Sequence, residues 1–388
     1  MSFALLALIC AVAMLGPIAN LNKTLRIPVV VGELAVGIIL GETGFRLVDA
    51  HDPTLSFMAE VGFALVMFVA GTHVPVRQPA MASGLRNGLL RAAAVGVLAV
   101  PLGLGIAAMF GIPHGPLYAV LIASSSAGIV MPALGGIKVT SRNGLEMLAQ
   151  LAVADAACIV ALPLAIDPTR AGSAALGAVA VIALAAVFYA FLLWTERTGR
   201  RRQLHQVSQR RGLAMELRVT LTLLFTLAAV AASMRVSVML AGFAMGLAVS
   251  AVGEPRRIAN QVFALSEGFF APVFFVWLGA SLDLRSLVAN PRAIGLGLAL
   301  GLAAVVAHGL LVLTRAPLPM AVATAAQLGV PVGAVTLGKT MGLLVDGEGT
   351  AMLLGAVLTI VVVTAVSTRL VHLVDGTTAP IVTDPATP

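Results

Sequence analysis

Charged residues are scarce in this chain of 388 residues. Asp, Glu, Lys and Arg make up only 11% of it, hydrophobic residues make up 59%, and the mean hydropathy is +1.02. Soluble globular domains carry about a quarter of charged residues, so this composition excludes one. The long apolar runs also lack the two-residue alternation of a membrane β-barrel. Helices remain as the way to satisfy the backbone in lipid, and the sequence therefore predicts an all-α polytopic membrane protein.

Cysteine is almost absent as well. Cys10 and Cys158 both fall in apolar segments without metal-ligand or CxxC spacing, which predicts packing roles and indicates neither disulfide nor metal chemistry. The sequence carries no pattern of a hydrolytic triad or metal cluster, so we expect neither an enzyme nor a bound metal or cofactor. The net charge of +7 and the pI near 10.4 come from basic residues scattered over short loops, which argues against a nucleic-acid partner.

Apolar segments of membrane-spanning length recur along the whole chain. They predict thirteen spans, at about 2–21, 27–41, 56–73, 87–110, 116–137, 146–166, 173–194, 213–231, 236–251, 260–281, 293–313, 317–339 and 350–372. Of the 24 Lys and Arg residues, 18 fall on one set of alternating connections and 6 on the other. By the positive-inside rule this bias predicts an inner-membrane protein with its N-terminus outside and its C-terminus in the cytoplasm.

The predicted spans divide into four segments. Residues 1–194 form a first transmembrane half, 195–218 a basic cytoplasmic linker, 219–372 a second transmembrane half and 373–388 a disordered cytoplasmic tail.

One carboxylate lies near the middle of a predicted span. Asp155 stands within the apolar stretch Leu145–Leu164. A charge at the bilayer centre costs about 3 to more than 10 kcal/mol, so such residues mostly face a cavity or a partner. Asp155 is therefore the first candidate for a functional site. The alternative is a protonated Asp that hydrogen-bonds a neighbouring helix and serves packing alone.

Two predicted spans carry helix breakers in mid-membrane. Ser124–Gly136 interrupts the fifth span and Gln327–Gly333 interrupts the twelfth. Such breakers free carbonyls and half-helix ends, which many transporters use for an ion site near the midplane, and Ser125 and Ser126 add hydroxyl oxygens. The alternative is that small residues merely let helices pack closely. Because one interruption lies in each half, we expect both to be unwound and to cross close to Asp155.

Further polar side chains fall inside predicted spans. Glu33, His308 and Gln327 are candidates for tuning the ion site or for a second proton site. A neutral, hydrogen-bonded core residue is the alternative for His308. Glu60 and Glu267 lie near span ends, where we expect solvated structural roles.

The segment Gly333–Thr340 matches the phosphate-loop pattern GxxxxGK[ST]. That pattern indicates nucleotide binding only between a strand and a helix of a soluble α/β unit. Here it ends a predicted membrane span, so we expect no nucleotide partner.

Four stretches carry a further pattern of spaced glycines, and three of them include an acid or a proline. They are Ile27–Gly41, Met58–Gly71, Leu240–Gly246 and Phe269–Asp283. Together they resemble the cation:proton antiporter-2 branch of the monovalent cation/proton exchangers. The resemblance implies inverted repeats with two crossing broken helices, a homodimer in which one domain moves against a dimerisation domain, and Asp155 as the aspartate that binds ion and proton.

The chain departs from this family at several positions. The polar residue before the family's aspartate is Ala154 here, and the lysine of the charge-coupled members corresponds to His308. Losing both partners is coherent, because a buried lysine without its acid would be an unpaired charge. The Arg and Glu that many members carry around the second broken helix are Leu328 and Val330 here, and the acid that follows the Met58–Gly71 signature is His73. We do not expect the C-terminal nucleotide-sensing domain that regulates the family's potassium-efflux members.

These observations predict a secondary antiporter that exchanges H⁺ for Na⁺ or K⁺ at Asp155 without net charge movement. Burial disfavours the bare carboxylate, so proton and cation compete for it, while Ser125, Ser126 and freed carbonyls complete the cation's shell. The expected partners are the cation, the proton, membrane lipid and a second copy of the chain. Two alternatives stay open: a proton-coupled transporter of another small solute, motivated by Ala154 and Val330, and a non-transporting membrane scaffold or sensor. Proton flux driven by an added cation distinguishes the antiporter from both alternatives.

Overall fold

The computed structural model describes residues 2–20, 29–72, 79–127, 129–130, 134, 139, 141–200, 208, 211, 213–234, 236–253, 256–282 and 284–374. Within these ranges the chain forms helices joined by turns, without a strand. His73, part of the predicted linker and nearly all of the predicted tail lie outside the described residues.

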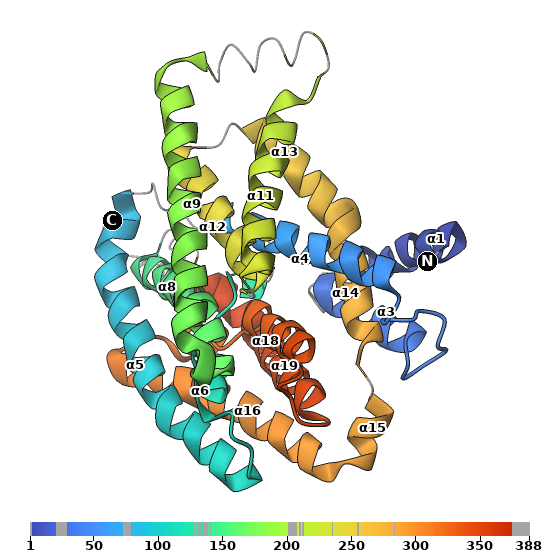
Figure 1. Ribbon diagram of the computed structural model, residues 1–388. Helices are drawn as coiled ribbons and strands as arrows, with labels where there is room; N and C mark the ends of the chain where they lie inside the picture. The colour runs from blue at the N-terminus through green and yellow to red at the C-terminus, as the bar shows by residue number, and fades with distance from the viewer. Residues whose placement is uncertain are drawn as a thin grey trace, which may run out of the picture.

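The helices follow one another along the chain as in Figure 1. They are α1 (Phe3–Ala13), α2 (Leu15–Asn20), α3 (Val29–Leu40), α4 (Pro53–Thr72), α5 (Pro79–Phe110), α6 (Gly115–Ala123), α8 (Arg142–Ile166), α9 (Ala171–Arg197), α11 (Met215–Ser233), α12 (Val238–Val252), α13 (Arg256–Leu265), α14 (Ala271–Ala280), α15 (Leu284–Ala289), α16 (Pro291–Gly309), α17 (Leu318–Ala323), α18 (Gly329–Met341) and α19 (Glu348–Val374). Short 3₁₀ helices η1 (Pro168–Arg170) and η3 (Leu310–Thr314) and a π-helical turn η2 (Ser266–Phe270) extend or join them.

Eight helical segments in the described ranges, each of 19 to 30 residues, are long and apolar enough to cross a bilayer. Three shorter apolar helices, Phe3–Ile18, Val29–Leu40 and Val238–Val252, accompany them. Every predicted span overlaps one of these helices, α6, or α17 and α18, and α6 covers only the first part of the fifth span. The all-helical membrane class is thus confirmed, whereas the number of thirteen crossings stays a prediction.

The helices pack as two bundles. Helices α5, α6, α8 and α16–α19 contact one another and form what we term the site bundle. Helices α1–α4 and α11–α14 form the scaffold bundle, and α9 contacts both α8 and α12. Figure 1 shows α5 and α6 on the left and α1, α3 and α14 on the right. Each bundle takes helices from both predicted halves of the chain, so the sequence halves are not separate units in space.

Glycines of the signature stretches bring the scaffold helices into backbone contact. A Cβ atom built on Gly246 of α12 would lie 2.2 Å from the carbonyl oxygen of Phe68 and 2.9 Å from Cα of Gly71 in α4. Gly279 of α14 meets Gly37 of α3 in the same way, 2.9 Å from its Cα. Small residues at such crossings let membrane helices approach closely, which explains the glycine spacing in these stretches.

We expect Gly246→Ala to destabilise the protein by about 1–3 kcal/mol, because the added methyl group forces α4 and α12 apart. Thermal unfolding of the detergent-solubilised protein measures this as a lower melting temperature. Gly96→Ala in α5 is the matched control, since nothing lies within 4 Å of a Cβ atom built there. Equal losses in the two variants would contradict a special requirement for glycine at the crossing.

Both predicted interruptions exist, but one is displaced. Helix α6 ends where Ser124 takes an extended conformation (φ −71°, ψ 151°), and Ser124–Ser126 are not helical, as predicted. In the twelfth span the interruption lies at Thr324–Leu328, so its predicted place around Val330 is wrong. Val330 lies in the first turn of α18, where Pro331 loses no hydrogen bond because the first amides of a helix have no intrahelical partner.

Candidate functional site

Asp155 lies midway along α8. This helix starts at Ser141, whose hydroxyl accepts a hydrogen bond from the Gly144 amide at 3.1 Å, a regular N-cap. The Asp155 side chain is buried, with 4% of the residue exposed. Within the described part of the chain, no donor or cationic side chain contacts its carboxylate. The structure therefore places an unpaired acid inside the site bundle.

An ion pair anchors the first turns of α8 to α5. The Glu146 carboxylate lies 2.9 Å from a terminal guanidinium nitrogen of Arg91 and accepts hydrogen bonds from Asn87 at 2.8 Å and from Arg142 at 3.2 Å. Arg91 also donates to the Thr314 hydroxyl at the end of η3. A buried carboxylate with this many partners holds α8, and with it Asp155, in a fixed register against α5.

Contacts on either side of Asp155 place it beside the interruption in the twelfth span. Five residues earlier, the Gln150 amide donates to the Thr324 hydroxyl at 3.0 Å. Seven residues later, on the same helix face, Leu162 packs against α18, 3.1 Å from a Cβ atom built on Gly333. Because Thr324 begins the interruption and Gly333 lies just beyond it, the part of α8 that carries Asp155 lies alongside the non-helical segment.

Hydrogen bonds join the two interruptions to each other. The Ser125 hydroxyl donates to the Thr324 carbonyl at 2.7 Å, and the Gln327 amide donates to the Leu121 carbonyl at 2.7 Å. The Gln327 backbone amide in turn donates to the Thr359 hydroxyl of α19 at 3.1 Å. The predicted meeting of the two broken spans therefore has a polar basis in which each break satisfies backbone groups of the other.

His308 of α16 lies between the same two interruptions. Its Nδ1 lies 2.8 Å from the Thr324 hydroxyl and its Nε2 lies 3.3 Å from the Ile122 carbonyl. A carbonyl only accepts, so Nε2 carries a proton when this bond forms. The Thr324 hydroxyl also lies 2.7 Å from the Ala321 carbonyl, and its single hydrogen serves either that carbonyl or Nδ1. A neutral His308 is fully bonded when the hydroxyl turns to Nδ1.

The predicted site residues separate into three groups. Ser125 and His308 both bond Thr324, Gln327 bonds the Leu121 carbonyl at the same pair of interruptions, and Ser126 is buried with 4% exposed. Asp155 lies on the helix that contacts Thr324 through Gln150. Glu33 lies instead in α3 of the scaffold bundle, where its Cγ lies 3.2 Å from a Cβ atom built on Gly16.

Sequence reasoning missed Gln150 and Thr324. Both are buried and together they connect the Asp155 helix to His308. A signal was present, because Gln150 is a polar residue inside the same predicted span as Asp155, and Thr324 stands in a run of small residues before Gln327.

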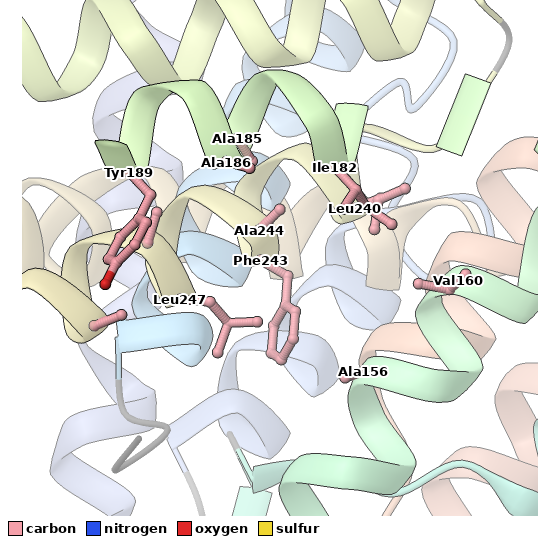
Figure 2. A pocket seen from close by; sticks show the side chains of 12 residues that line it. Ala156, Val160, Ile182, Ala185, Ala186, Tyr189, Leu240, Phe243, Ala244 and Leu247 are labelled. Atoms are coloured by element: carbon pink, nitrogen blue, oxygen red, sulfur yellow. The ribbon is translucent and has the colours of Figure 1, made fainter. Parts of the chain in front are cut away.

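An apolar cavity of about 400 Å³ lies on another side of α8, between this helix and α9 and α12 (Figure 2). Ala156 and Val160 of α8 face Leu240 and Phe243 of α12 across it, and Tyr189 of α9 closes one end. Ala156 directly follows Asp155. The helix that carries the acid therefore has free volume between it and the scaffold bundle.

The described helices define a polytopic membrane protein in which two interrupted spans meet beside a buried acid. Residues 10–376 match the model of the family described as sodium/hydrogen exchanger, transmembrane, and the chain belongs to this family. The resemblance to the monovalent cation/proton exchangers predicted from the four glycine-bearing stretches is thereby confirmed.

Three relatives illustrate the similarity. The putative Na⁺/H⁺ antiporter YjbQ of Bacillus subtilis (strain 168) is 26% identical over 300 residues, which are 74% of this chain and 48% of YjbQ. The probable Na⁺/H⁺ antiporter 3 of Methanocaldococcus jannaschii is 26% identical over 69% of each chain. The glutathione-regulated potassium-efflux system protein KefC of Salmonella typhimurium is 30% identical over 70% of this chain and 44% of KefC. The chain thus spans about half the length of YjbQ and KefC.

Solved structures agree with the fold. Two structures of the sodium proton antiporter MjNhaP1 from Methanocaldococcus jannaschii superpose with TM-scores of 0.57 and 0.66. They cover 96% of this chain and 98% and 99% of theirs, at 16% and 15% identity. At this identity the likeness concerns the fold.

Proposed function

We propose that the protein is a secondary antiporter that exchanges H⁺ for Na⁺ or K⁺ at Asp155. One observation carries the proposal: a buried carboxylate without a partner among the described residues lies beside two interrupted membrane helices. Such a group binds either a proton or a cation, because each neutralises a charge that burial makes costly. The family and the named activities of YjbQ and KefC support the same exchange.

The protein supplies the rest of the cation's shell from the interruption in the fifth span. Ser125 directs its hydroxyl hydrogen at the Thr324 carbonyl, which leaves the oxygen lone pairs free to face a cation. Ser126 adds a second hydroxyl. The carboxyl end of α6 also points at this place, and a helix C-terminus stabilises positive charge.

We propose further that the protein lies in the inner membrane with its N-terminus outside and its C-terminus in the cytoplasm. Two copies form a homodimer. The bias of basic residues supports the orientation. In the homodimer, the scaffold bundle would be the fixed part against which the site bundle moves, and the free volume beside Ala156 supports such movement.

Everted membrane vesicles test the exchange. Respiration acidifies the lumen and quenches a pH-sensitive dye, and addition of Na⁺, K⁺ or Li⁺ then reverses the quench if the cation is exchanged for protons. We expect dequenching with Na⁺ or K⁺. Folded protein that responds to none of the three cations would contradict the proposal.

We expect Ser125→Ala to raise the half-saturating cation concentration about five- to tenfold, because a lost ligand or hydrogen bond is worth about 1 kcal/mol. Ser124→Ala is the matched control, since its hydroxyl donates only to the Leu121 carbonyl in its own turn. The concentration dependence of dequenching measures both. If Ser124→Ala has the larger effect, the assignment of Ser125 is wrong.

A second candidate, a proton-coupled transporter of another small solute, is supported by one observation. The carbonyl oxygens of Leu121, Ile122 and Thr324 already accept hydrogen bonds from side chains, so they are not free to coordinate a cation. This candidate predicts proton flux driven by the solute and none driven by Na⁺, K⁺ or Li⁺.

A further inference from the structure

A second cavity, of about 570 Å³, lies between the two bundles on the face predicted to be outside. Its walls come from α4, η1, α11, the start of α12 and the last turns of α18. The lining residues are Glu60, Phe63, Arg170, Ala232, Val236, Ser237, Val238, Thr336, Leu337, Thr340 and Met341. The cavity therefore has one wall on the scaffold bundle and one on the helix that leads away from the twelfth-span interruption.

One carboxylate and one guanidinium group line this cavity. Glu60 is exposed to it and has no ion-pair partner in the described part of the chain. Arg170 is held by Asp167, with 3.6 Å between its Nε and the carboxylate. Hydrogen bonds from the side chain and amide of Thr169 keep the pKa of Asp167 below its usual range, so Asp167 stays charged and retains Arg170. Because Arg170 pairs with Asp167, it does not neutralise the charge of Glu60.

Hydroxyl oxygens complete the polar part of the lining. Thr336 and Thr340 lie one turn apart on the same face of α18, and the Thr340 hydroxyl donates to the Thr336 carbonyl at 2.8 Å. That geometry leaves oxygen lone pairs on the cavity side. A carboxylate opposed by hydroxyl oxygens suits a hydrated monovalent cation, because oxygen ligands replace part of its water shell.

Apolar side chains separate this cavity from Asp155. Gly333, one turn before Leu337, is covered by Met239 of α12 and Leu162 of α8, each 3.1 Å from a Cβ atom built on Gly333. Apolar side chains of both bundles therefore pack at Gly333, between the turn of α18 that leads to the cavity and helix α8.

We propose that this cavity is an outer collecting site for the monovalent cation, with Glu60 and the two threonine hydroxyls as its ligands and Arg170 as the group that limits its affinity. The inference rests on the proposed function, because it assigns the route by which the cation reaches Asp155. Since Glu60 belongs to the scaffold and the threonines to the site bundle, movement of one against the other opens the ligand set and releases the cation.

Cysteine labelling tests the electrostatics without relying on transport. In a Cys10→Ser background, Ala232→Cys places a thiol in the cavity wall, and its reaction rates with a cationic and an anionic methanethiosulfonate are compared in proteoliposomes at low ionic strength. We expect Glu60→Gln to lower the cationic-to-anionic rate ratio about three- to tenfold, and Arg170→Gln to raise it by a similar factor. Val288→Cys on α15, which is exposed outside the cavity, is the control whose ratio should not respond.

Transport then tests the role. We expect Glu60→Gln to raise the half-saturating cation concentration about three- to tenfold when the cation is added on the side of the membrane where Ala232 lies. The half-saturating concentration on the other side and the maximal rate should not change. Glu267→Gln, on a turn that does not line the cavity, is the matched control. An unchanged labelling ratio in both Glu60→Gln and Arg170→Gln overturns the collecting site even if exchange is present. A changed ratio with no exchange in the wild type would instead overturn the proposed function and leave only a charged cavity.

Discussion

Asp155→Asn should abolish cation-driven proton movement. The amide keeps the size of the carboxyl group but can neither release a proton nor neutralise a cation, so both halves of the exchange fail together. The folded protein should tolerate the change, because an unpaired buried acid contributes no ion pair whose loss would destabilise it. We expect dequenching to fall to the level of vesicles without the protein, with a melting temperature equal to or above that of the wild type.

Asp346→Asn is the matched control for this variant. Asp346 lies exposed in the turn between α18 and α19, and the same chemical change there should leave exchange intact. Residual exchange above a few per cent in folded Asp155→Asn would mean that another group carries the proton. Glu33 and His308 are then the next residues to replace, and they report from different bundles.

The general architecture could be predicted from sequence because the signals of membrane helices lie within short stretches of the chain. Long apolar runs, the basic bias of the loops and the glycine spacing of the signature stretches all concern residues near one another in the chain. The interruption at Ser124–Ser126 was predictable for the same reason. Three consecutive serines disfavour a helix, because their hydroxyl groups bond nearby backbone groups in place of helical hydrogen bonds.

The details that failed depend on contacts between distant segments. Pro331 and its flanking glycines suggest a break, yet they begin a helix, because the break had already occurred at Thr324. There Ser125 donates to the freed backbone carbonyl, and Gln150 and His308 bond the hydroxyl. These partners lie 16 to 199 residues away. The sequence could not show that Glu33, a candidate for tuning the ion site, lies in the scaffold bundle, because packing decides to which bundle a helix belongs.

The segment that imitates a phosphate loop illustrates the same limit. Gly333–Thr340 forms the body of α18, and both of its glycines are helical. Gly333 makes room for Met239 and Leu162, and Gly338 makes room for Leu344. Spacing that would signal a nucleotide in an α/β protein here reflects close packing between helices.

Exchange should be indifferent to membrane potential, because one proton replaces one cation at a single carboxylate. Ala154 cannot release a second proton. His308 has no acidic partner among the described residues, and its ring nitrogens face a hydroxyl and a carbonyl that already satisfy the neutral form. An imidazolium there would be a buried charge without a counter-ion, so the histidine contributes hydrogen bonds and no carried charge.

The prediction has a large dynamic range. If a net unit charge moved, 100 mV would contribute about 2.3 kcal/mol, equivalent to about 50-fold in the exchange equilibrium, whereas one-for-one exchange gives no change. Proteoliposomes clamped with K⁺ and valinomycin, with Na⁺ as the exchanged cation and an internal pH dye, measure the difference. We expect equal Na⁺-driven pH changes at 0 and at −100 mV, and His308→Ala should retain exchange. If the pH change follows the potential in the wild type and loses that dependence in His308→Ala, the single-carrier mechanism is wrong. The histidine is then a second proton carrier, and the Thr324 hydroxyl accepts from Nδ1 when the ring is protonated.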